Sequence, residues 1–370
     1  MRVVHLANYG GPYAGSFIPM IAAAGRAARE AGWQVTIAFT QGARDRAWLR
    51  ELAADDLEVV FAPPGGQGAK AGWIGELLGG RDEPAILHTH FTTFDLPALR
   101  AARGRRRTAV VWHVHTTLRP ERAMRLRNAV KLGLVGRRAH AIVCVGEAIA
   151  EQVLERYAPR GRVTVLPNAI DLRRFPPIDA DRRRAARGAL GLEDGTPAVL
   201  HFGWDWRVKG GDLLAAAVER AARGGPIVAL TVGGDDPARA ARERVGLDAG
   251  VLRVVKPTDD VASLYAAADA FAATSRGEAF SFAVAEALAS GLPVVATDIP
   301  AHAALAREVG NVRLVPGEPD AVAAALREAL EREPGAAREQ AVRARERVAE
   351  RFGTERWTRE LIELYGRILP

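Results

Sequence analysis

Short apolar runs alternate with helical stretches along the whole chain, and this alternation most restricts its possible folds. In the first half the apolar runs cover residues 2–7, 34–39, 85–88, 109–113 and 141–145. After a polar, proline-bearing connection at 170–187, further runs cover 199–202, 227–232, 251–255, 270–274, 293–297 and 312–315. Apolar strands separated by helices predict parallel sheets covered on both faces. We therefore expect an α/β protein with two Rossmann-like domains.

The length of 370 residues also suits two domains better than one core. We place the N-terminal domain at residues 1–168, the C-terminal domain at 169–352 and a final helix at 353–370. Ser16 is expected to cap a helix that runs to about Ala31, where Gly32 ends it. Further expected helices cover residues 213–222 and 281–290, a charged stretch at 320–351, and residues 355–368.

Cysteine content and local patterns exclude several classes of protein. Cys144 is the only cysteine, which rules out a disulfide framework and fits a reducing, cytoplasmic compartment. The first residues have no signal-peptide pattern, and no run of about twenty apolar residues could span a membrane. Asp179 and Asp181 match a metal-binding D-x-D pattern only inside the polar connection, so we expect no metal.

Positive charge is concentrated in one window. Of the net charge of +7, residues 100–140 contribute +11, because twelve Lys and Arg side chains accompany one acid, Glu121, and the rest of the chain carries −4. This distribution indicates a local anionic partner rather than nucleic acid. Residues 118–138 intersperse basic and apolar side chains, a pattern that suits peripheral contact with an anionic membrane. An anionic acceptor or a solvated arginine-rich helix would also explain it.

The segment 274–297 carries the clearest chemical signal. A strand ends at Thr274, a loop contains Glu278, and a helix is expected from Ser281, with Glu286 a little over one turn into it. The free N–H groups at a helix start bind anions, and a carboxylate can accept hydrogen bonds from two sugar hydroxyls. Two surface glutamates are the simpler alternative, but Glu286 has apolar neighbours. The segment therefore predicts a sugar-nucleotide site.

Two further features follow strands of the N-terminal half. Gly10, Gly11, Gly15 and Ser16 form a glycine-rich loop whose spacing differs from G-x-G-x-x-G, which argues against a dinucleotide oxidoreductase. Four histidines lie at the ends of two other strands, where parallel sheets bind ligands. They could ligate zinc, but hydrogen-bonded structural histidine is expected for two of them. These four histidines are His88, His90, His113 and His115. We expect a structural role for His88 and His113.

Four segments in order resemble glycosyltransferase family 4. They are residues 165–175 (VLPNAIDLRRF), 202–214 (FGWDWRVKGGDLL), 264–271 (LYAAADAF) and the E-x7-E segment with its GLPVVAT ending. The resemblance implies the GT-B fold, in which two Rossmann-like domains face a cleft and a C-terminal helix returns to the N-domain. It further implies a retaining glycosyltransferase that uses a UDP- or GDP-type sugar donor, with no metal or other cofactor, and a small-molecule, glycan or lipid-linked acceptor.

The resemblance also implies roles for single residues. Lys209 would neutralise the donor diphosphate, Glu278 would hold the transferred sugar and Glu286 the ribose. His115 would lie beside the donor sugar as a catalytic contact. Family members often carry Arg where this chain has Trp204, and Arg207 is the candidate substitute. The other implied contacts are the backbone of Ala279, Phe280 and Ser281, Lys256 beside the base, Gly11 at the donor, and Gly10, Gly15 and Ser16 on the acceptor side.

Two other functions remain open at this point. A sugar-nucleotide epimerase has the same fold, and a basic binding protein would need no catalysis. The sequence does not identify the sugar, the base, the acceptor or the oligomeric state. A cytoplasmic location, or a peripheral one at the inner membrane surface, is expected.

Overall fold

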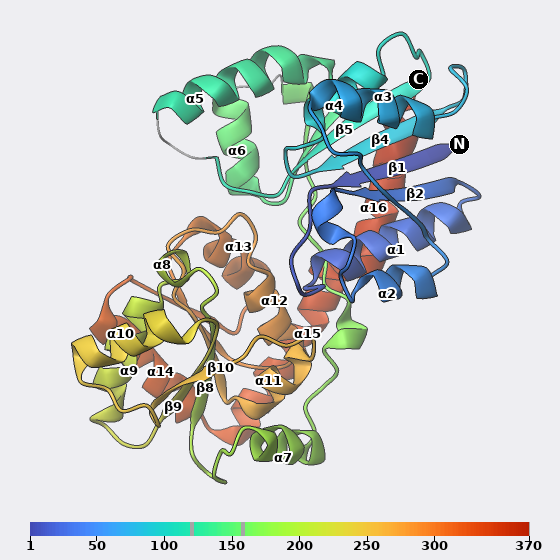
Figure 1. Ribbon diagram of the computed structural model, residues 1–370. Coiled ribbons are helices and arrows are strands. Elements are labelled where there is room, and N and C mark those ends of the chain that lie inside the picture. Colours follow the sequence, from blue (N-terminus) through green and yellow to red (C-terminus); the bar gives the residue numbers. More distant parts are fainter. Residues whose placement is uncertain (119–121, 157–159, 370) are drawn as a thin grey trace. The chain divides into compact units, whose positions relative to one another are not determined.

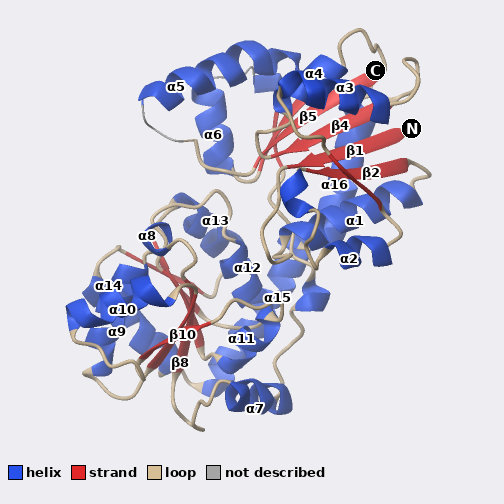
Figure 2. Ribbon diagram, in the orientation of Figure 1, coloured by secondary structure: helices blue, strands red, loops and turns tan. Residues whose placement is uncertain are grey.

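The computed structural model describes residues 1–118, 122–156 and 160–369, and the chain divides into two compact units. The first comprises Met1–Ala169 together with Thr354–Pro370, and the second comprises Ile170–Gly353. In each unit a parallel sheet forms the middle layer and helices cover it (Figures 1 and 2). The expected fold of two Rossmann-like parallel-sheet domains is therefore confirmed.

The N-terminal unit has a seven-stranded sheet in the order β3-β2-β1-β4-β5-β6-β7. The strands are β1 (Arg2–Ala7), β2 (Gln34–Phe39), β3 (Glu58–Phe61), β4 (Ala85–His90), β5 (Thr108–Val114), β6 (Ala141–Cys144) and β7 (Val163–Val165). The two edge strands, β3 and β7, were not expected from the sequence. Both are short and only partly buried: the apolar run at β3 covers just residues 59–62, and that at β7 is interrupted by Thr164.

Helices flank this sheet. They are α1 (Phe17–Glu30), α2 (Leu49–Ala54), α3 (Gln67–Leu77), α4 (Asp95–Ala101), α5 (Arg122–Asn128), α6 (Glu147–Arg156) and α16 (Thr354–Ile368). The C-terminal helix α16 packs against α1, as Figure 1 shows, and places Trp357 and Leu361 in the core of this unit. The last residues of the chain thus complete a core that the first residues begin.

The first helix begins and ends close to the expected positions. Ser16 occupies the N-cap position of α1, but its side chain makes no capping hydrogen bond, which corrects that part of the prediction. Its backbone there is helical, with φ −92° and ψ −9°, rather than extended as in a standard N-cap. The helix ends at Glu30, and Gly32 follows with φ +77°, a conformation that favours glycine.

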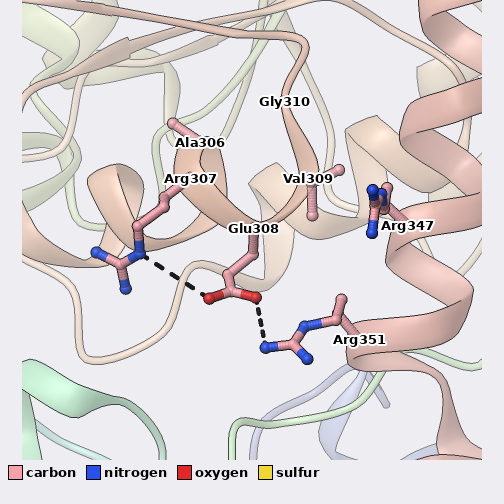
Figure 3. Close-up of a pocket in the computed structure, with 7 residues that line it drawn as sticks. All are labelled: Ala306, Arg307, Glu308, Val309, Gly310, Arg347 and Arg351. Atoms are coloured by element: carbon pink, nitrogen blue, oxygen red, sulfur yellow. Dashed lines mark ion pairs between the residues drawn. The ribbon is translucent and has the colours of Figure 1, made fainter.

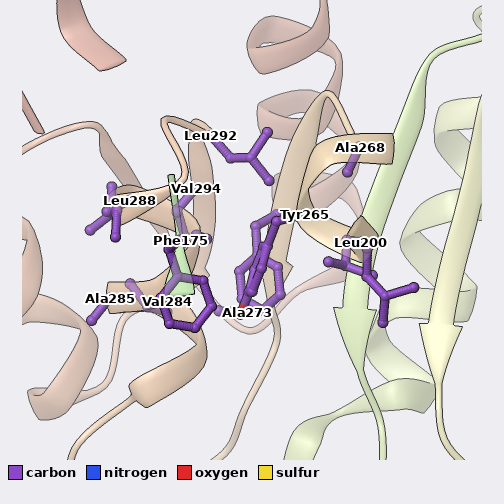
Figure 4. Packing of buried hydrophobic residues seen from close by; sticks show 14 of the residues in the cluster. Phe175, Leu200, Tyr265, Ala268, Ala273, Val284, Ala285, Leu288, Leu292 and Val294 are labelled. Carbon is purple, nitrogen blue, oxygen red and sulfur yellow. The ribbon is translucent and has the colours of Figure 1, made fainter. Parts of the chain in front are cut away.

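The second unit has a six-stranded parallel sheet in the order β10-β9-β8-β11-β12-β13. The strands are β8 (Ala198–Phe202), β9 (Val228–Val232), β10 (Leu252–Val255), β11 (Ala270–Ala273), β12 (Val294–Thr297) and β13 (Val312–Val315). Side chains alternate between two cores, so Val199 faces one and Leu200 the other. Each sheet face is thereby covered by its own apolar layer, one of which is drawn in Figure 4.

The helices of this unit differ from expectation in two places. They are α7 (Ala180–Ala189), α8 (Trp206–Lys209), α9 (Gly211–Ala222), α10 (Asp235–Val245), α11 (Val261–Ala267), α12 (Phe282–Ala289), α13 (Pro300–Val309), α14 (Pro319–Leu330) and α15 (Pro334–Phe352). The expected connection at 170–187 contains α7, which packs on α11. The expected stretch at 320–351 is two helices, because Pro334 begins a new one.

Candidate functional site

Two loops meet at the carboxyl end of the second sheet, where the strand order reverses between β8 and β11. Such a switch point is where open parallel sheets bind ligands. The loop after β8 is fastened to β11, because Thr274 Oγ1 donates to the carbonyls of Lys209 and Gly210, both at 3.0 Å. Arg276 N donates to the Val208 carbonyl at 2.8 Å. These bonds fix the backbone position of Lys209, from which its side chain extends.

Gly210 makes this close approach possible. Its φ is +68°, and a Cβ at this position would lie 2.0 Å from the Thr274 carbonyl oxygen. Real Cβ atoms do not come so close to backbone, so only glycine fits. The side chain of Arg276 holds the loop from outside, through hydrogen bonds of 2.8 and 2.7 Å to the two carboxylate oxygens of Asp212.

Lys209 and Glu278 form an ion pair at this position. Lys209 Nζ lies 2.6 Å from Glu278 Oε1, and the same oxygen accepts a 2.9 Å hydrogen bond from Ser275 Oγ. The exposed fractions of the two charged side chains are 21% and 14%. The structure thus brings together two residues, 69 positions apart in sequence, that were predicted to act on one ligand.

Glu286 lies on α12 and is buried, with 7% of its surface exposed. Tyr265 Oη donates a 2.8 Å hydrogen bond to Glu286 Oε2. Burial, together with the nearby Glu286 charge, raises the pKa of Tyr265 well above its usual value, so this hydroxyl stays a donor. The Tyr265 ring packs among buried apolar side chains that include Phe175 (Figure 4).

The helix that carries Glu286 begins just after the loop of Glu278. Ser281 is the N-cap of α12 and makes no side-chain capping bond, while Ala279 and Phe280 are half-buried before it. The first N–H groups of a helix have no partner inside the helix. The start of α12 therefore offers donors to an anion beside the two glutamates.

The structure places the other predicted residues of this unit at its surface. Arg207 and Lys256 are exposed, and the Arg207 carbonyl accepts a 2.6 Å hydrogen bond from Arg276. Trp204, which stands where family members often have Arg, is 51% exposed and stacks on Phe202 with ring centroids 4.8 Å apart. An aromatic face rather than a cation therefore occupies this position.

Three residues near the loops were not recognised in the sequence. Tyr265 and Ser275 hold the two glutamates, and His302 of α13 is buried below the loop, where its Nδ1 lies 2.9 Å from the Thr297 carbonyl. Burial lowers the pKa of His302. Tyr265 does fall in the segment 264–271, so a signal was present, whereas His302 follows no motif.

A separate surface pocket of about 540 Å³ lies between the end of α13 and α15 (Figure 3). Glu308 forms ion pairs there with Arg351 at 2.5 Å and with Arg307 at 3.9 Å. No residue predicted to bind the donor lines it, so we assign it no part in the site.

The glycine-rich loop of the N-terminal unit follows β1, which borders the other switch point, between β1 and β4. Trp48 Nε1 donates a 2.9 Å hydrogen bond to the Gly11 carbonyl, and Tyr9 Oη donates to the Tyr13 carbonyl at 2.8 Å. A Cβ on Gly10 would lie 3.2 Å from the backbone of Gly42. Gly15 has φ +55°, a conformation that glycine adopts readily.

Five histidines lie together at the same sheet edge, and we call them the histidine cluster. The register pairs His5 with His88 and His90 with His113, so residues that are neighbours across strands share one face. His115 follows β5 two residues after His113 and joins them, with ring centroids 4.0 Å apart. The sequence pointed to four of these imidazoles and missed His5.

Hydrogen bonds arrange the histidine cluster in two chains. In one, His5 Nδ1 lies 3.0 Å from His90 Nε2, and His90 Nδ1 lies 3.0 Å from His115 Nε2. In the other, Tyr365 Oη lies 2.5 Å from His88 Nδ1, and His88 Nε2 lies 3.2 Å from His113 Nδ1. His88 is therefore hydrogen-bonded at both nitrogens, as a structural histidine should be.

His113 departs from that expectation. Its Nε2, like that of His5, is buried with no hydrogen-bond partner among the described residues. Burial lowers the pKa of His5 and of His115 to about 3, and it lowers those of the other three well below the usual value. The imidazoles are thus neutral at pH 7, the form that binds metal ions.

The basic segment forms α5 and a following π-helical turn, Ala129–Val135. Leu126, Val130 and Leu134 are spaced four apart and are 70%, 49% and 66% exposed. Lys131, by contrast, pairs with the buried Asp95. Arg119 and Glu121 lie outside the described residues. None of the helices in the described part of the chain has the length and apolar character to cross a bilayer.

Comparison with known proteins identifies similar families and folds. The family model described as Glycosyltransferase Family 4 matches residues 20–174, and the one described as Glycosyl transferases group 1 matches residues 196–332. A D-inositol 3-phosphate glycosyltransferase of Nocardia farcinica is 33% identical over 45% of this chain and 40% of the relative. The D-inositol 3-phosphate glycosyltransferase of Corynebacterium urealyticum is 30% identical over 63% of this chain and 57% of the relative. The chain thus aligns with about half the length of these relatives.

Solved structures share the fold over nearly the whole chain. A glycosyltransferase of Rickettsia africae has a TM-score of 0.84 at 16% identity and covers 100% of this chain and 98% of its own. HepE of Anabaena, solved with UDP and glucose, has a TM-score of 0.83 at 20% identity, with 98% of each chain covered. Both are similar in fold, and their architecture matches the GT-B expectation.

Proposed function

Since the chain belongs to the group 1 glycosyltransferases of glycosyltransferase family 4, we propose that it moves a sugar from a nucleotide diphosphate sugar to an acceptor hydroxyl. The proposal includes retention of the anomeric configuration and a donor site that needs no metal. The observation that carries it is the pair of Lys209 and Glu278 beside the start of α12.

The donor diphosphate is proposed to take Lys209 away from Glu278. Lys209 Nζ and the N–H groups at the start of α12 would then neutralise the charge that grows on the leaving diphosphate. Glu278, released from its ion pair, would accept hydrogen bonds from the sugar hydroxyls. Glu286, oriented by Tyr265, would hold the ribose hydroxyls. Each charged group exchanges one hydrogen-bond partner for another, so none is left buried without one.

The proposed transfer balances without a protein base. The bond between the sugar C1 and the diphosphate oxygen breaks while a bond from C1 to the acceptor oxygen forms on the same face. The acceptor proton passes to an oxygen of the departing diphosphate. The N-terminal unit, with its Gly10–Gly11 loop and His115, is proposed to serve the acceptor and the donor sugar.

Donor and acceptor can be proposed only by class. A UDP-sugar is the first donor to test, because HepE of similar fold was solved with UDP and glucose. D-inositol 3-phosphate is the first acceptor to test, because relatives that share 30–33% identity carry its name. A thermal-shift panel of UDP-, GDP-, ADP- and TDP-sugars should identify the donor, since a ligand at 100 times its Kd adds about 2.7 kcal/mol of stability.

Transfer detected by mass spectrometry tests the site. We expect Lys209→Ala and Glu286→Ala each to lower turnover by about 100-fold or more, the scale of losing one group that stabilises charge in the transition state. Glu339→Ala, at an exposed glutamate of α15, is the control. Unchanged turnover in both site variants would refute the assignment. An isomerised sugar nucleotide formed without acceptor would instead favour the epimerase.

We further propose that the exposed face of α5 and the turn after it contacts an anionic membrane. Its three exposed apolar side chains, Leu126, Val130 and Leu134, can enter the acyl region. Arg125, Arg127, Arg137 and Arg138 are exposed nearby and can meet lipid phosphates. A lipid-linked acceptor would then be reached at the surface where it resides.

A further inference from the structure

The histidine cluster contains three imidazoles in an arrangement suited to a metal ion. One ring nitrogen from each of His90, His113 and His115 lies within 4.8 Å of the other two. His90 Nδ1 and His115 Nε2 are 3.0 Å apart. Two nitrogens bound to one tetrahedral Zn²⁺ at 2.0–2.1 Å are separated by about 3.3 Å. A small shift of two side chains would therefore bring this pair to the spacing of ligands.

The outer nitrogens of two of these rings, His113 and His90, are already held by hydrogen bonds. His113 Nδ1 lies 3.2 Å from His88 Nε2, and His90 Nε2 lies 3.0 Å from His5 Nδ1. His88 is in turn hydrogen-bonded to Tyr365. Histidines that bind metals characteristically use the second ring nitrogen in such a bond, which fixes the tautomer and the ring orientation. Here a second layer of imidazoles supplies the partners.

A metal ion would give the inner nitrogen of His113 the partner that it lacks. His113 Nε2 is buried with no hydrogen-bond partner among the described residues, and such an atom ordinarily costs about 1–3 kcal/mol. The other trio, His5 with His88 and His90, also contains an unpartnered nitrogen, His5 Nε2, but both ring nitrogens of His88 are engaged by residues outside it, Tyr365 and His113. His90 also uses both nitrogens, but one of its partners is His115 of the same trio. The engagement of His88, together with the unpartnered nitrogen of His113, thus favours the trio of His90, His113 and His115.

We propose that His90, His113 and His115 bind one divalent transition-metal ion of the kind that imidazole prefers, such as Zn²⁺ or Co²⁺. His115 is the half-buried member, so the ion would enter on its side. The three ligands are neutral imidazoles with no carboxylate or thiolate among them, so they do not offset the 2+ charge of the ion. We therefore expect hydroxide or another anion as the fourth ligand. All three ligands belong to the N-terminal unit, and the proposal does not rest on the proposed function. Where the ion is bound, His115 is its ligand and not the contact to the donor sugar.

Titration of the full chain with Co²⁺ tests this proposal. After treatment with a chelator at pH 7.5, we expect one Co²⁺ per chain, visible ligand-field absorption of four-coordinate cobalt, and displacement by one equivalent of Zn²⁺. A wild-type chain that takes up no stoichiometric Co²⁺ or Zn²⁺ would overturn the proposal without recourse to any variant.

Variants then assign the ligands. We expect His5→Gln, which removes an outer partner, to weaken Co²⁺ binding about 10–100-fold, and His113→Gln to weaken it more. His140→Gln, at a histidine of the same unit outside the cluster, should leave it unchanged. Circular dichroism of each metal-free variant checks that it folds. Binding that survives His113→Gln in a folded chain, or that is lost in His140→Gln, would place the metal elsewhere.

Discussion

The Tyr265 hydroxyl donates a 2.8 Å hydrogen bond to Glu286 Oε2, so a tyrosine in the helix before β11 orients a carboxylate on the helix after it. The tyrosine ring is fully buried, and its hydroxyl also lies 3.1 Å from the Ala283 carbonyl on the same helix as Glu286. A hydrogen bond to a charged group contributes about 1.5–3 kcal/mol. The orientation of Glu286 therefore depends on a residue that would never touch the ribose.

Tyr265→Phe should raise the KM for the sugar-nucleotide donor about 10-fold and change kcat little, because the ring stays packed and only the hydroxyl's bonds to Glu286 and to the Ala283 carbonyl are lost. Steady-state kinetics with the donor varied measures this. In a Glu286→Gln background the same change should have almost no further effect. Equal effects in both backgrounds would mean that Tyr265 acts through the core and not through Glu286.

Gly210→Ala should destabilise the protein by more than about 3 kcal/mol, because a Cβ there would lie 2.0 Å from the Thr274 carbonyl oxygen. Gly246→Ala is the matched control, since this glycine has the same φ of +68° with no atom within 4 Å of the added Cβ. It should cost only about 1 kcal/mol, the price of the backbone conformation alone. Urea unfolding compares the two, and similar losses would contradict the close approach of the loops.

Because of His201, the free energy of unfolding should decrease as the pH is lowered. Burial lowers its pKa to about 4, against 6.5 when unfolded, so the unfolded chain takes up a proton first as the pH falls. The stabilisation is complete above pH 6.5 and is lost progressively down to pH 4. It amounts to about 3 kcal/mol.

Urea unfolding of the wild type and of His201→Gln at pH 7.5, 5.5 and 4 isolates this effect. Glutamine can still hydrogen-bond to Thr231 and to the Lys209 carbonyl, the two partners of the imidazole, but it does not titrate. The stability of the wild type should therefore fall more steeply than that of the variant. Parallel curves would show that His201 has the same pKa in both states.

Leu126→Asp combined with Leu134→Asp should weaken binding to vesicles that contain anionic phosphatidylglycerol by about 10-fold or more, since each buried leucine contributes about 1.5–3 kcal/mol. Vesicle co-sedimentation measures this. Val342→Asp, at a 52% exposed apolar side chain of α15, is the control. If the wild type does not sediment, or if the control behaves like the double variant, the face does not meet lipid.

Local patterns account for what could be predicted. The central strands of both sheets are continuous apolar runs, and the segment around Glu278 and Glu286 is contiguous in sequence, so its strand, loop and helix could be located. The edge strands β3 and β7 have shorter or interrupted apolar runs, and the break at Pro334 lies within a charged stretch whose pattern favours one continuous helix.

The histidine cluster shows where this reasoning stops. That His5 lies beside His88, and His90 beside His113, depends on the register of three parallel strands separated by long connections. Alternation within one strand assigns side chains to a face, but it does not give the offset between strands. The ion pair between Lys209 and Glu278 could not be predicted for the same reason, since it joins loops that follow two different strands.

The division of the chain has a consequence for how it matures during synthesis. Residues 170–353 form an uninterrupted unit, whereas the unit that begins at Met1 also needs Trp357, Leu361 and Tyr365 of α16. Domains usually fold in the order in which the ribosome releases them. Here the later-made unit can close its core first, and the earlier-made one must wait for residues 354–369 to leave the exit tunnel.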